Sequence, residues 1–145
     1  MKIAIATDHN GVNEKKELIK RLSEYEFIDK SPINYSTDDY PDFAFLVGEA
    51  VINKEADLGI LMCGTGIGMS IAANKMKGIR CAHCSNLSEA HLAREHNDAN
   101  IIALSYKKSL DELTEMIKEF ITTNHSDEEK HKRRVSKIVK YEMSE

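Results

Sequence analysis

The sequence has no long apolar run, no tryptophan and only two prolines. Among its 145 residues no stretch of about 18 apolar side chains could span a bilayer. The first apolar run, residues 3–6, is soon followed by Asp8 and His9, too early for the core of a signal peptide. These absences predict a protein that does not enter a membrane and that stays in the cytoplasm.

Cysteine is scarce, and the three cysteines lie close together in the sequence, at positions 63, 81 and 84. A disulfide-stapled secreted domain usually has an even and well-spread set, so we expect free thiols. The C-x-x-C of Cys81 and Cys84 could be a redox pair or half of a zinc site. Zinc would need a second ligand pair, whereas His91 and His96 fall on different sides of a helix. A redox pair usually opens a helix, but Cys81 falls in an expected strand, so we favour neither use.

Basic residues do not dominate, because the formal net charge is −4. This charge argues against general binding of nucleic acids, and any anion bound is expected to be small. Positive charge gathers only at residues 130–134, a run that could be an ordinary solvated face of a helix. Alternatively, Lys130 and Arg134 lie one helical turn apart on the same face, a geometry that suits a phosphate. Lys132 and Arg133 would then point elsewhere.

The length favours one domain, residues 1–145, and the apolar runs predict its architecture. Short apolar runs alternate with helical patterns, which is typical of βαβ units in a parallel sheet with helices on both faces. The expected strands are residues 2–7, a weaker one around 27–28, and residues 57–62, 79–84 and 100–104. We therefore predict an α/β fold with an open, mostly parallel, five-stranded Rossmann-like sheet.

The clearest helical patterns are residues 43–51, which follow Pro41, and residues 110–121. Ser109 and Glu112 form a capping-box pattern at the start of the second of these helices.

Three further signals concern the ends of helices and one long loop. Ser126 and Glu129 repeat the capping-box pattern and predict the start of a last helix there. Gly78 is expected to end the helix that follows Gly68. The irregular and polar residues 29–40 predict a long loop near the sheet.

Polar residues follow the first and third expected strands, at the edge where open parallel sheets bind ligands. Asp8 and His9 follow the first strand, although either could simply be a polar residue satisfied at a strand end. His96 precedes the fifth strand and could be a proton carrier or an ordinary residue at a helix terminus.

Cys63 follows the third strand and opens a segment with three glycines, at Gly64, Gly66 and Gly68. Glycines at a helix N-terminus let backbone N–H groups face an anion, and they favour the thiolate of Cys63 as a base or nucleophile. The alternative is a buried cysteine beside a tight turn. The glycine spacing is not that of a Rossmann fingerprint and no P-loop lysine follows, so a nucleotide is not indicated.

Together these motifs are similar to those of a known family, and the match covers nearly the whole chain. The chain resembles ribose-5-phosphate isomerase of the B type, within the group that includes the galactose-6-phosphate isomerase subunits. The resemblance rests on Thr7-Asp8-His9-Asn10-Gly11, on Asp39-Tyr40-Pro41, on Cys63 to Gly68 with Ser70-Ile71-Ala72-Ala73-Asn74-Lys75, and on His96-Asn97-Asp98-Ala99-Asn100.

The resemblance implies an aldose-ketose isomerase that acts through an enediolate. It assigns Cys63 as the base that transfers a proton between C1 and C2, and His96 as the residue that opens the sugar ring. It implies that Asp8 holds substrate hydroxyls and that Tyr40 lines the pocket. The enediolate would be stabilised by Thr65 with the backbone of Gly64, Gly66, Ile67 and Gly68.

The resemblance also implies a phosphate site, and the groups that would form it are His9, Asn97, Lys107, Lys130 and Arg134. It further implies a homodimer or a tetramer in which each site draws residues from two subunits. The mechanism requires no metal and no organic cofactor.

The chain departs from the family pattern at the phosphate end of the site. Lys107 and Lys130 stand where arginine is usual, and lysine lacks the bidentate fork of arginine. Ser105 and Tyr106 replace a smaller, glycine-containing step, and residues 127–129 are acidic where glycines are common. A six-carbon sugar phosphate, of allose or galactose, therefore remains an alternative substrate.

Two other functions share the expected fold. A receiver or flavodoxin-like binding module would have the same sheet, but a receiver needs an aspartate where this chain has Cys63, and Asp57 lies at the other end of that strand. A catalytically idle subunit of a two-protein isomerase is the second alternative. The presence of both Cys63 and His96 argues against it.

Overall fold

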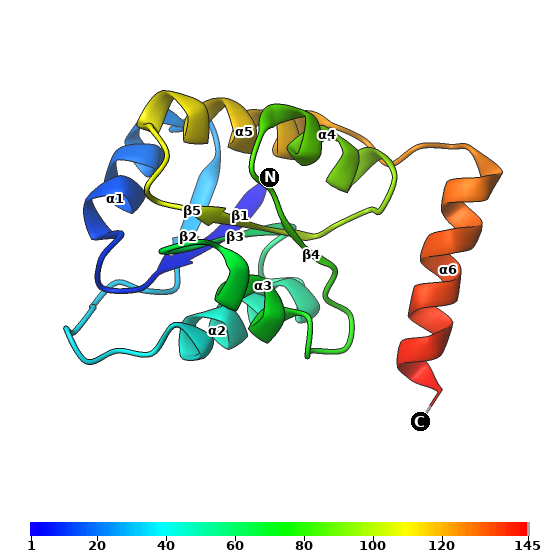
Figure 1. Cartoon of the computed structure of the whole chain (residues 1–145), viewed down its shortest axis with the longest axis horizontal. Helices are drawn as coiled ribbons and strands as arrows, with labels where there is room; N and C mark the ends of the chain where they lie inside the picture. The colour runs from blue at the N-terminus through cyan, green and yellow to red at the C-terminus, as the bar shows by residue number, and fades with distance from the viewer. Residues whose placement is uncertain (145) are drawn as a thin grey trace.

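The computed structural model describes residues 1–144, in which a five-stranded sheet lies between two layers of helices (Figure 1). Along the chain the elements are β1 (Lys2–Thr7), α1 (Val12–Arg21), β2 (Glu26–Asp29), α2 (Tyr40–Ile52), β3 (Leu58–Cys63), α3 (Ile67–Ala73), β4 (Cys81–His83), α4 (Leu87–Glu95), β5 (Ile101–Ser105), α5 (Leu110–Thr122) and α6 (Glu129–Met143). The predicted α/β class and the five-stranded parallel sheet are confirmed.

The strand order is β2-β1-β3-β5-β4, and all neighbouring strands are parallel. From β1 the chain turns to β2 on one side and then to β3 on the other, so a topological switch point lies between β1 and β3. Thr7 pairs with Met62, and Cys63 pairs with Ser105. The ends of β1, β3 and β5 therefore meet at one edge of the sheet, which we call the carboxyl edge.

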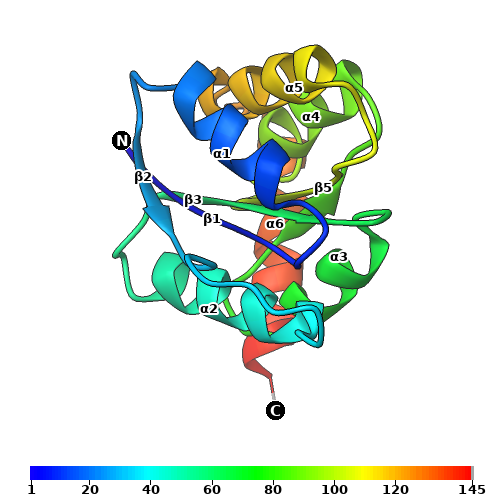
Figure 2. The same ribbon diagram turned by 90° about the vertical axis from the view of Figure 1, so that its left-hand side faces the viewer.

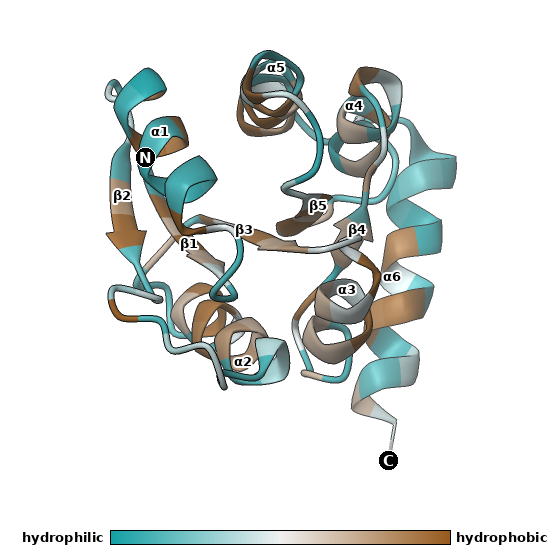
Figure 3. Cartoon of the chain, turned by 60° about the vertical axis from the view of Figure 1, so that its left-hand side comes forward, coloured by the Kyte–Doolittle hydropathy of each residue, from teal (hydrophilic) through white to brown (hydrophobic). Residues whose placement is uncertain are grey.

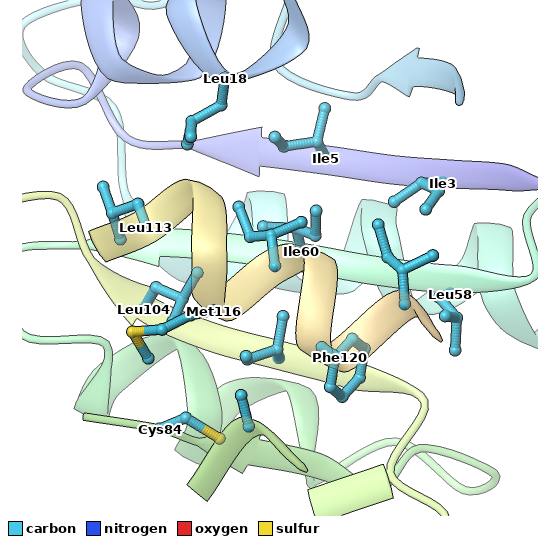
Figure 4. Packing of buried hydrophobic residues seen from close by; sticks show 14 of the residues in the cluster. Ile3, Ile5, Leu18, Leu58, Ile60, Cys84, Leu104, Leu113, Met116 and Phe120 are labelled. Carbon is cyan, nitrogen blue, oxygen red and sulfur yellow. The ribbon is translucent and has the colours of Figure 1, made fainter. Parts of the chain in front are cut away.

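Alternating side chains of the strands build two cores, one on each face of the sheet. In β1, Ile3 and Ile5 pack under α1, α4 and α5, where Leu18 and Phe120 meet them (Figures 2 and 4). Ala4 lies on the opposite face among residues of α2 and α3. This double coverage explains why β1 and β3 read as continuous apolar runs rather than as alternating ones.

The last helix, α6, stands beside β4 and apart from the two helical layers (Figures 1 and 3). His131 and Val135 are its buried residues, whereas Ile138 and Val139 remain exposed. Figure 3 shows apolar bands along this otherwise hydrophilic helix. Within residues 1–144 no helix is both long and apolar enough to cross a membrane.

Several local predictions agree with the structure. The strand at residues 2–7 has the predicted bounds, and the weaker one around residues 27–28 is β2. The capping box is present at the start of α5, where the Ser109 side chain accepts a hydrogen bond from the backbone N–H of Glu112. The expected loop after β2 is also found, since α2 begins only at Tyr40.

Two predicted helix boundaries are wrong. α6 begins at Glu129 after the N-cap Glu128, and Ser126 instead accepts a hydrogen bond from the backbone N–H of Glu128, two residues on. Helix α3 ends at Ala73, well before Gly78, because the chain turns there toward β4. Gly78 has a φ of 92° and belongs to that turn rather than to the helix end.

Candidate active site

The Cys63 thiol lies at the end of β3, buried on the face that α2 and α3 cover. Its sulfur accepts a hydrogen bond from the backbone N–H of Gly66, with N and Sγ 3.2 Å apart. Gly66 has a φ of 82°, and a Cβ there would lie 3.0 Å from the carbonyl carbon of Leu104. Only glycine fits this backbone, so the turn that places an N–H on the sulfur depends on Gly66.

Three contacts hold the segment between Cys63 and α3 in place. The Ser105 hydroxyl donates to the carbonyl oxygen of Gly64 at 2.7 Å, and the ring Nε2 of His83 donates to that of Thr65 at 2.8 Å. The exposed Thr65 hydroxyl accepts from the backbone N–H of Ile67 at 3.1 Å. The segment is therefore a fixed loop that keeps the Thr65 side chain at the surface beside the Cys63 turn.

Asp8 and His9 follow β1 at the same edge. The Asp8 carboxylate accepts from the backbone N–H of Asn10, and the His9 ring Nδ1 lies 2.7 Å from Oδ1 of Asp38. Burial acts to raise the pKa of Asp38, but hydrogen bonds from Asn34 and from His9 outweigh it and lower that pKa. Because a carboxylate only accepts, Nδ1 of His9 carries the proton, and Nε2 is left for a ligand.

Tyr40 begins α2 and lies against the first turn of α3. A Cβ on Gly68 would lie 2.6 Å from the Tyr40 ring, so the absence of a side chain at Gly68 makes room for the ring. The ring is partly exposed, which places it at the surface of the loop that follows Cys63.

Tyr106, which we considered only as a departure from the family pattern, belongs to this edge. Its backbone N–H donates to the carbonyl oxygen of Cys63, and its hydroxyl lies 3.6 Å from where a Cβ on Gly64 would be. Burial and the nearby charge of Asp8 raise the pKa of its phenol, against a hydrogen bond from Asn10. Its position directly after β5 was the signal in the sequence that could have identified it.

Asp38, Asn34 and His83 are the other residues at this edge that we did not predict. Asn34 donates to Asp38 and also to the carbonyl oxygen of Thr7, which ties the loop after β2 to the end of β1. His83 sits inside the C-x-x-C that we weighed for metal or redox use, and its ring instead holds the Thr65 carbonyl. Lys107, a predicted phosphate ligand, follows β5 at the carboxyl edge and is exposed.

His96 and Asn97 lie near the amino ends of the strands, opposite the carboxyl edge. We call this end of the sheet the His96 edge. His96 is the C-cap of α4, five residues before β5 begins at Ile101, whereas Cys63 pairs with Ser105 at the end of β5. Four strand residues, about 13 Å, separate these two levels. One copy of the chain therefore does not bring His96 to Cys63.

The His96 ring is held by two neighbours. It stacks on the His131 ring of α6, with centroids 4.1 Å apart and planes 12° from parallel, and its Nε2 lies 3.4 Å from Oε1 of Glu95. Burial and the nearby charges of His96, Lys130 and Arg134 lower the pKa of His131, against Glu128. At neutral pH the His131 ring is therefore uncharged, and its face packs against the face of the His96 ring.

Lys130 and Arg134 are exposed on α6 and belong with the His96 edge rather than with Cys63. They are four residues apart on one helix, which places them on the same face as predicted. Lys130 pairs with Glu128 at 3.5 Å, one of the acidic residues that precede the helix.

Cys81 and Cys84 are not arranged as a functional pair. They are packed in the cores on opposite faces of the sheet, and burial raises the pKa of each thiol to about 12. In residues 1–144 no three histidine, cysteine or acidic side chains gather where they could hold a metal ion.

Comparisons with known proteins identify the family of this chain. The sequence profile of the Ribose/Galactose Isomerase family matches residues 3–138. Ribose-5-phosphate isomerase B of Escherichia coli is 41% identical over 144 residues, which cover 98% of this chain and 97% of that protein.

Solved structures give the same result. The type B ribose 5-phosphate isomerase of Trypanosoma brucei superimposes with a TM-score of 0.92 at 41% identity, covering 97% of each chain. That of Mycoplasma genitalium, solved with bound ribulose-5-phosphate, has a TM-score of 0.91 at 40% identity and covers 99% of this chain and 97% of its own. This chain therefore belongs to the ribose/galactose isomerase family and is a sugar-phosphate isomerase.

Proposed function

We propose that this enzyme interconverts ribose 5-phosphate and ribulose 5-phosphate, and that residues 1–145 act as one catalytic domain. The observation that carries the proposal is the Cys63 sulfur at the end of β3, fixed by the Gly66 N–H inside the loop of three glycines. The Mycoplasma genitalium relative has ribulose-5-phosphate bound, which supports the five-carbon substrate.

In the proposed reaction Cys63 acts as the base on the open-chain aldose. Its thiolate removes the proton from C2, the electron pair forms the C1–C2 double bond, and the carbonyl oxygen becomes the enediolate oxygen. Thr65 and the backbone N–H groups of residues 64–68 stabilise this oxygen, which for Gly66 and Ile67 means that the N–H turns from its present acceptor, the Cys63 sulfur or the Thr65 hydroxyl, to the substrate. The hydroxyl proton of O2 then passes to O1, the electron pair left on O2 forms the C2 carbonyl, and Cys63 returns its proton to C1 as the C1–C2 double bond opens, which leaves a hydroxyl on C1 and restores the thiolate. This route uses acid–base groups alone.

Asp8 and Tyr40 are proposed to bind the sugar. Asp8 lies beside the Cys63 loop and accepts hydroxyl donors, and the Tyr40 ring forms a wall next to Gly68. Asp38 holds His9 through Nδ1, so Nε2 can donate to an anion when the ring carries both protons, and His9 is the proposed phosphate ligand at this edge together with Lys107.

The remaining roles require a second copy of the chain. His96, proposed to open the sugar ring, and the phosphate ligands Asn97, Lys130 and Arg134 lie at the edge opposite Cys63. We propose a homodimer, alone or within a tetramer, in which the His96 edge of one copy completes the Cys63 edge of the other. The exposed apolar residues Ile138 and Val139 of α6 support such an association.

Mixing two inactive variants tests the shared site directly. Cys63→Ala and His96→Asn are each prepared, then combined by joint unfolding and refolding or by co-expression. A shared site gives each mixed dimer one site with neither substitution, so about a quarter of the wild-type activity returns in a random mixture. If each site lay within one chain, no mixed dimer would contain an intact site and no activity would return.

The substrate is tested by NMR with purified protein and ribose, allose and galactose phosphates. We expect turnover of ribose 5-phosphate. The six-carbon sugars remain the second candidate because Tyr106 lies beside Gly64 and because Lys107 and Lys130 alter the phosphate end of the site. Turnover of a six-carbon phosphate alone would replace the proposed substrate, and turnover of none would contradict all three candidate sugars.

A further inference from the structure

Glu95, which we have not assigned a role in the reaction, lies between two histidines near the end of α4. Its Oε2 lies 2.9 Å from Nε2 of His91, one helical turn earlier, and its Oε1 lies 3.4 Å from Nε2 of His96. One carboxylate therefore faces both rings, each through a different oxygen.

The carboxylate of Glu95 is itself fixed through His91. The other ring nitrogen of His91, Nδ1, lies 2.7 Å from Oε2 of Glu119 on α5 and 3.2 Å from the hydroxyl of Thr123. Because carboxylates only accept, His91 donates through both nitrogens. Hydrogen bonds to Glu119 and then to Glu95 raise the pKa of His91, consistent with a ring that carries both protons.

The same residue also ties the start of α6 to α4. The main-chain oxygen of Glu95 accepts from the backbone N–H of Ser126 at 2.8 Å, in the segment that leads to α6. His131 of α6 then stacks on His96. The His96 ring is thus held across its face by His131 and at its edge by Glu95.

We propose that Glu95 is a positioning residue for His96, held in place by His91 and Glu119. The inference rests on the proposed role of His96 in ring opening. A carboxylate oxygen 3.4 Å from a ring nitrogen favours a proton on that nitrogen, so the Glu95 carboxylate biases a neutral His96 toward the tautomer with its proton on Nε2. It also keeps the ring in one orientation, and a misplaced catalytic group loses rate steeply.

The test compares a substrate that needs ring opening with one that does not. Erythrose 4-phosphate cannot close a furanose ring, because its terminal oxygen carries the phosphate. We expect Glu95→Gln to lower kcat for ribose 5-phosphate by about tenfold and to leave kcat for erythrose 4-phosphate within about twofold. Glu115→Gln, a matched substitution on the exposed surface of α5, is expected to change neither.

A spectroscopic measurement tests the positioning without any substrate. In ¹⁵N-labelled protein at a pH where the ring is neutral, the His96 signals, assigned by their loss in His96→Asn, should report the proton on Nε2. In Glu95→Gln they should report a mixture of the two tautomers. If Glu95→Gln fails to fold, Glu119→Gln replaces it, and a smaller change in the same direction is expected because Glu95 itself remains.

Each outcome separates the inference from the proposed function. Wild-type protein that fails to turn over ribose 5-phosphate contradicts the proposed function, whereas the tautomer measurement still decides the role of Glu95. Active wild-type protein with equal losses on both substrates in Glu95→Gln would make Glu95 a general structural residue. An unchanged tautomer with unchanged kcat would also overturn the inference.

Discussion

The residues proposed to act in the reaction are held differently at the two edges of the sheet. At the carboxyl edge the backbone holds the site: the Gly66 N–H contacts the Cys63 sulfur, and Gly68 leaves room for Tyr40. At the opposite edge side chains do this work, through the stack of His131 on His96. The removal of a proton from carbon is thus proposed for the carboxyl edge, where backbone groups rather than side chains hold the reacting residue.

Of the lysine and arginine side chains proposed to bind phosphate, Lys130 and Arg134 lie at the His96 edge and Lys107 lies at the carboxyl edge. Lys130 and Arg134 are exposed on a helix that stands outside the two layers, and within the chain Lys130 pairs only loosely with Glu128. The ammonium of Lys130 sits on a flexible stem and binds an anion as a point charge, without the fixed geometry of the arginine fork. This suits a phosphate several bonds away from the reacting carbons.

The largest effect is expected at Cys63. Cys63→Ala should reduce turnover of both ribose 5-phosphate and erythrose 4-phosphate by roughly 10⁴-fold, since only Cys63 is proposed to touch the carbon-bound proton.

Alkylation of the wild-type protein should inactivate it by modifying Cys63, and bound substrate should protect this residue. Burial raises the pKa of Cys81 and Cys84 to about 12, so these thiols should react last. Mass mapping that finds either of them modified first, in step with loss of activity, would remove Cys63 from this role.

A smaller and more selective loss is expected at His96. His96→Asn should lower turnover of ribose 5-phosphate by roughly 10² or more and spare erythrose 4-phosphate, because that sugar has no ring to open. The wild-type rate on erythrose 4-phosphate is measured first, and circular dichroism checks that the variant folds. Equal loss of both activities in a folded variant would place His96 in the isomerisation step or in the architecture of the site.

The sequence predicted the carboxyl edge better than the other one, for a physical reason. Glycines and a cysteine at a strand end are local signals, because one short segment carries the whole loop from Cys63 to Gly68. The contacts of Tyr106 with Cys63, of Asp38 with His9 and of His83 with Thr65 join segments 18 or more positions apart in the sequence, and no local pattern reports such contacts. For the same reason the sequence order predicted the strands but not which of them would be neighbours.

Helix α6 illustrates the same limit. Its sequence predicted a helix opened by Ser126, but the helix begins at Glu129, because the Ser126 side chain accepts from the backbone N–H of Glu128 in a turn before the helix rather than capping it. That His131 would stack on His96 depends on how α6 docks against the end of α4, which is a tertiary contact. The separation of His96 from Cys63 followed from strand register, which only the structure gives.

A moderate effect is expected for the phosphate ligands. Arg134→Ala should mainly raise KM for ribose 5-phosphate, about tenfold or more, and leave kcat little changed, since a phosphate contact is made in ground state and transition state alike. Lys132→Ala is the matched control on α6 and should be nearly silent, because Lys132 lies on another face and only approaches Asp127. Equal changes in KM for both variants would mean that the basic run acts as a diffuse field rather than as a site.

The smallest effect concerns stability at the His96 edge, where His91 joins α4 to α5. Hydrogen bonds to Glu119 and Glu95 raise the pKa of His91 above its ordinary value of 6.5, and the bond from His91 lowers the pKa of Glu119 below its ordinary value of 4.5. A raised histidine pKa stabilises the fold fully below pH 6.5, and this stabilisation is lost as the pH rises through the raised value. The stabilisation that comes from the Glu119 carboxylate is lost only as the pH falls below 4.5 through the lowered pKa.

His91→Gln should therefore lower Tm by a few degrees at most, with the largest difference from wild type between about pH 5 and 6 and the smallest near pH 9. Thermal unfolding across this range measures the difference, with Glu115→Gln on α5 as the control that should show no such dependence. A constant difference at every pH would mean that His91 stabilises the fold by packing alone and that the ion pair with Glu119 and Glu95 contributes nothing.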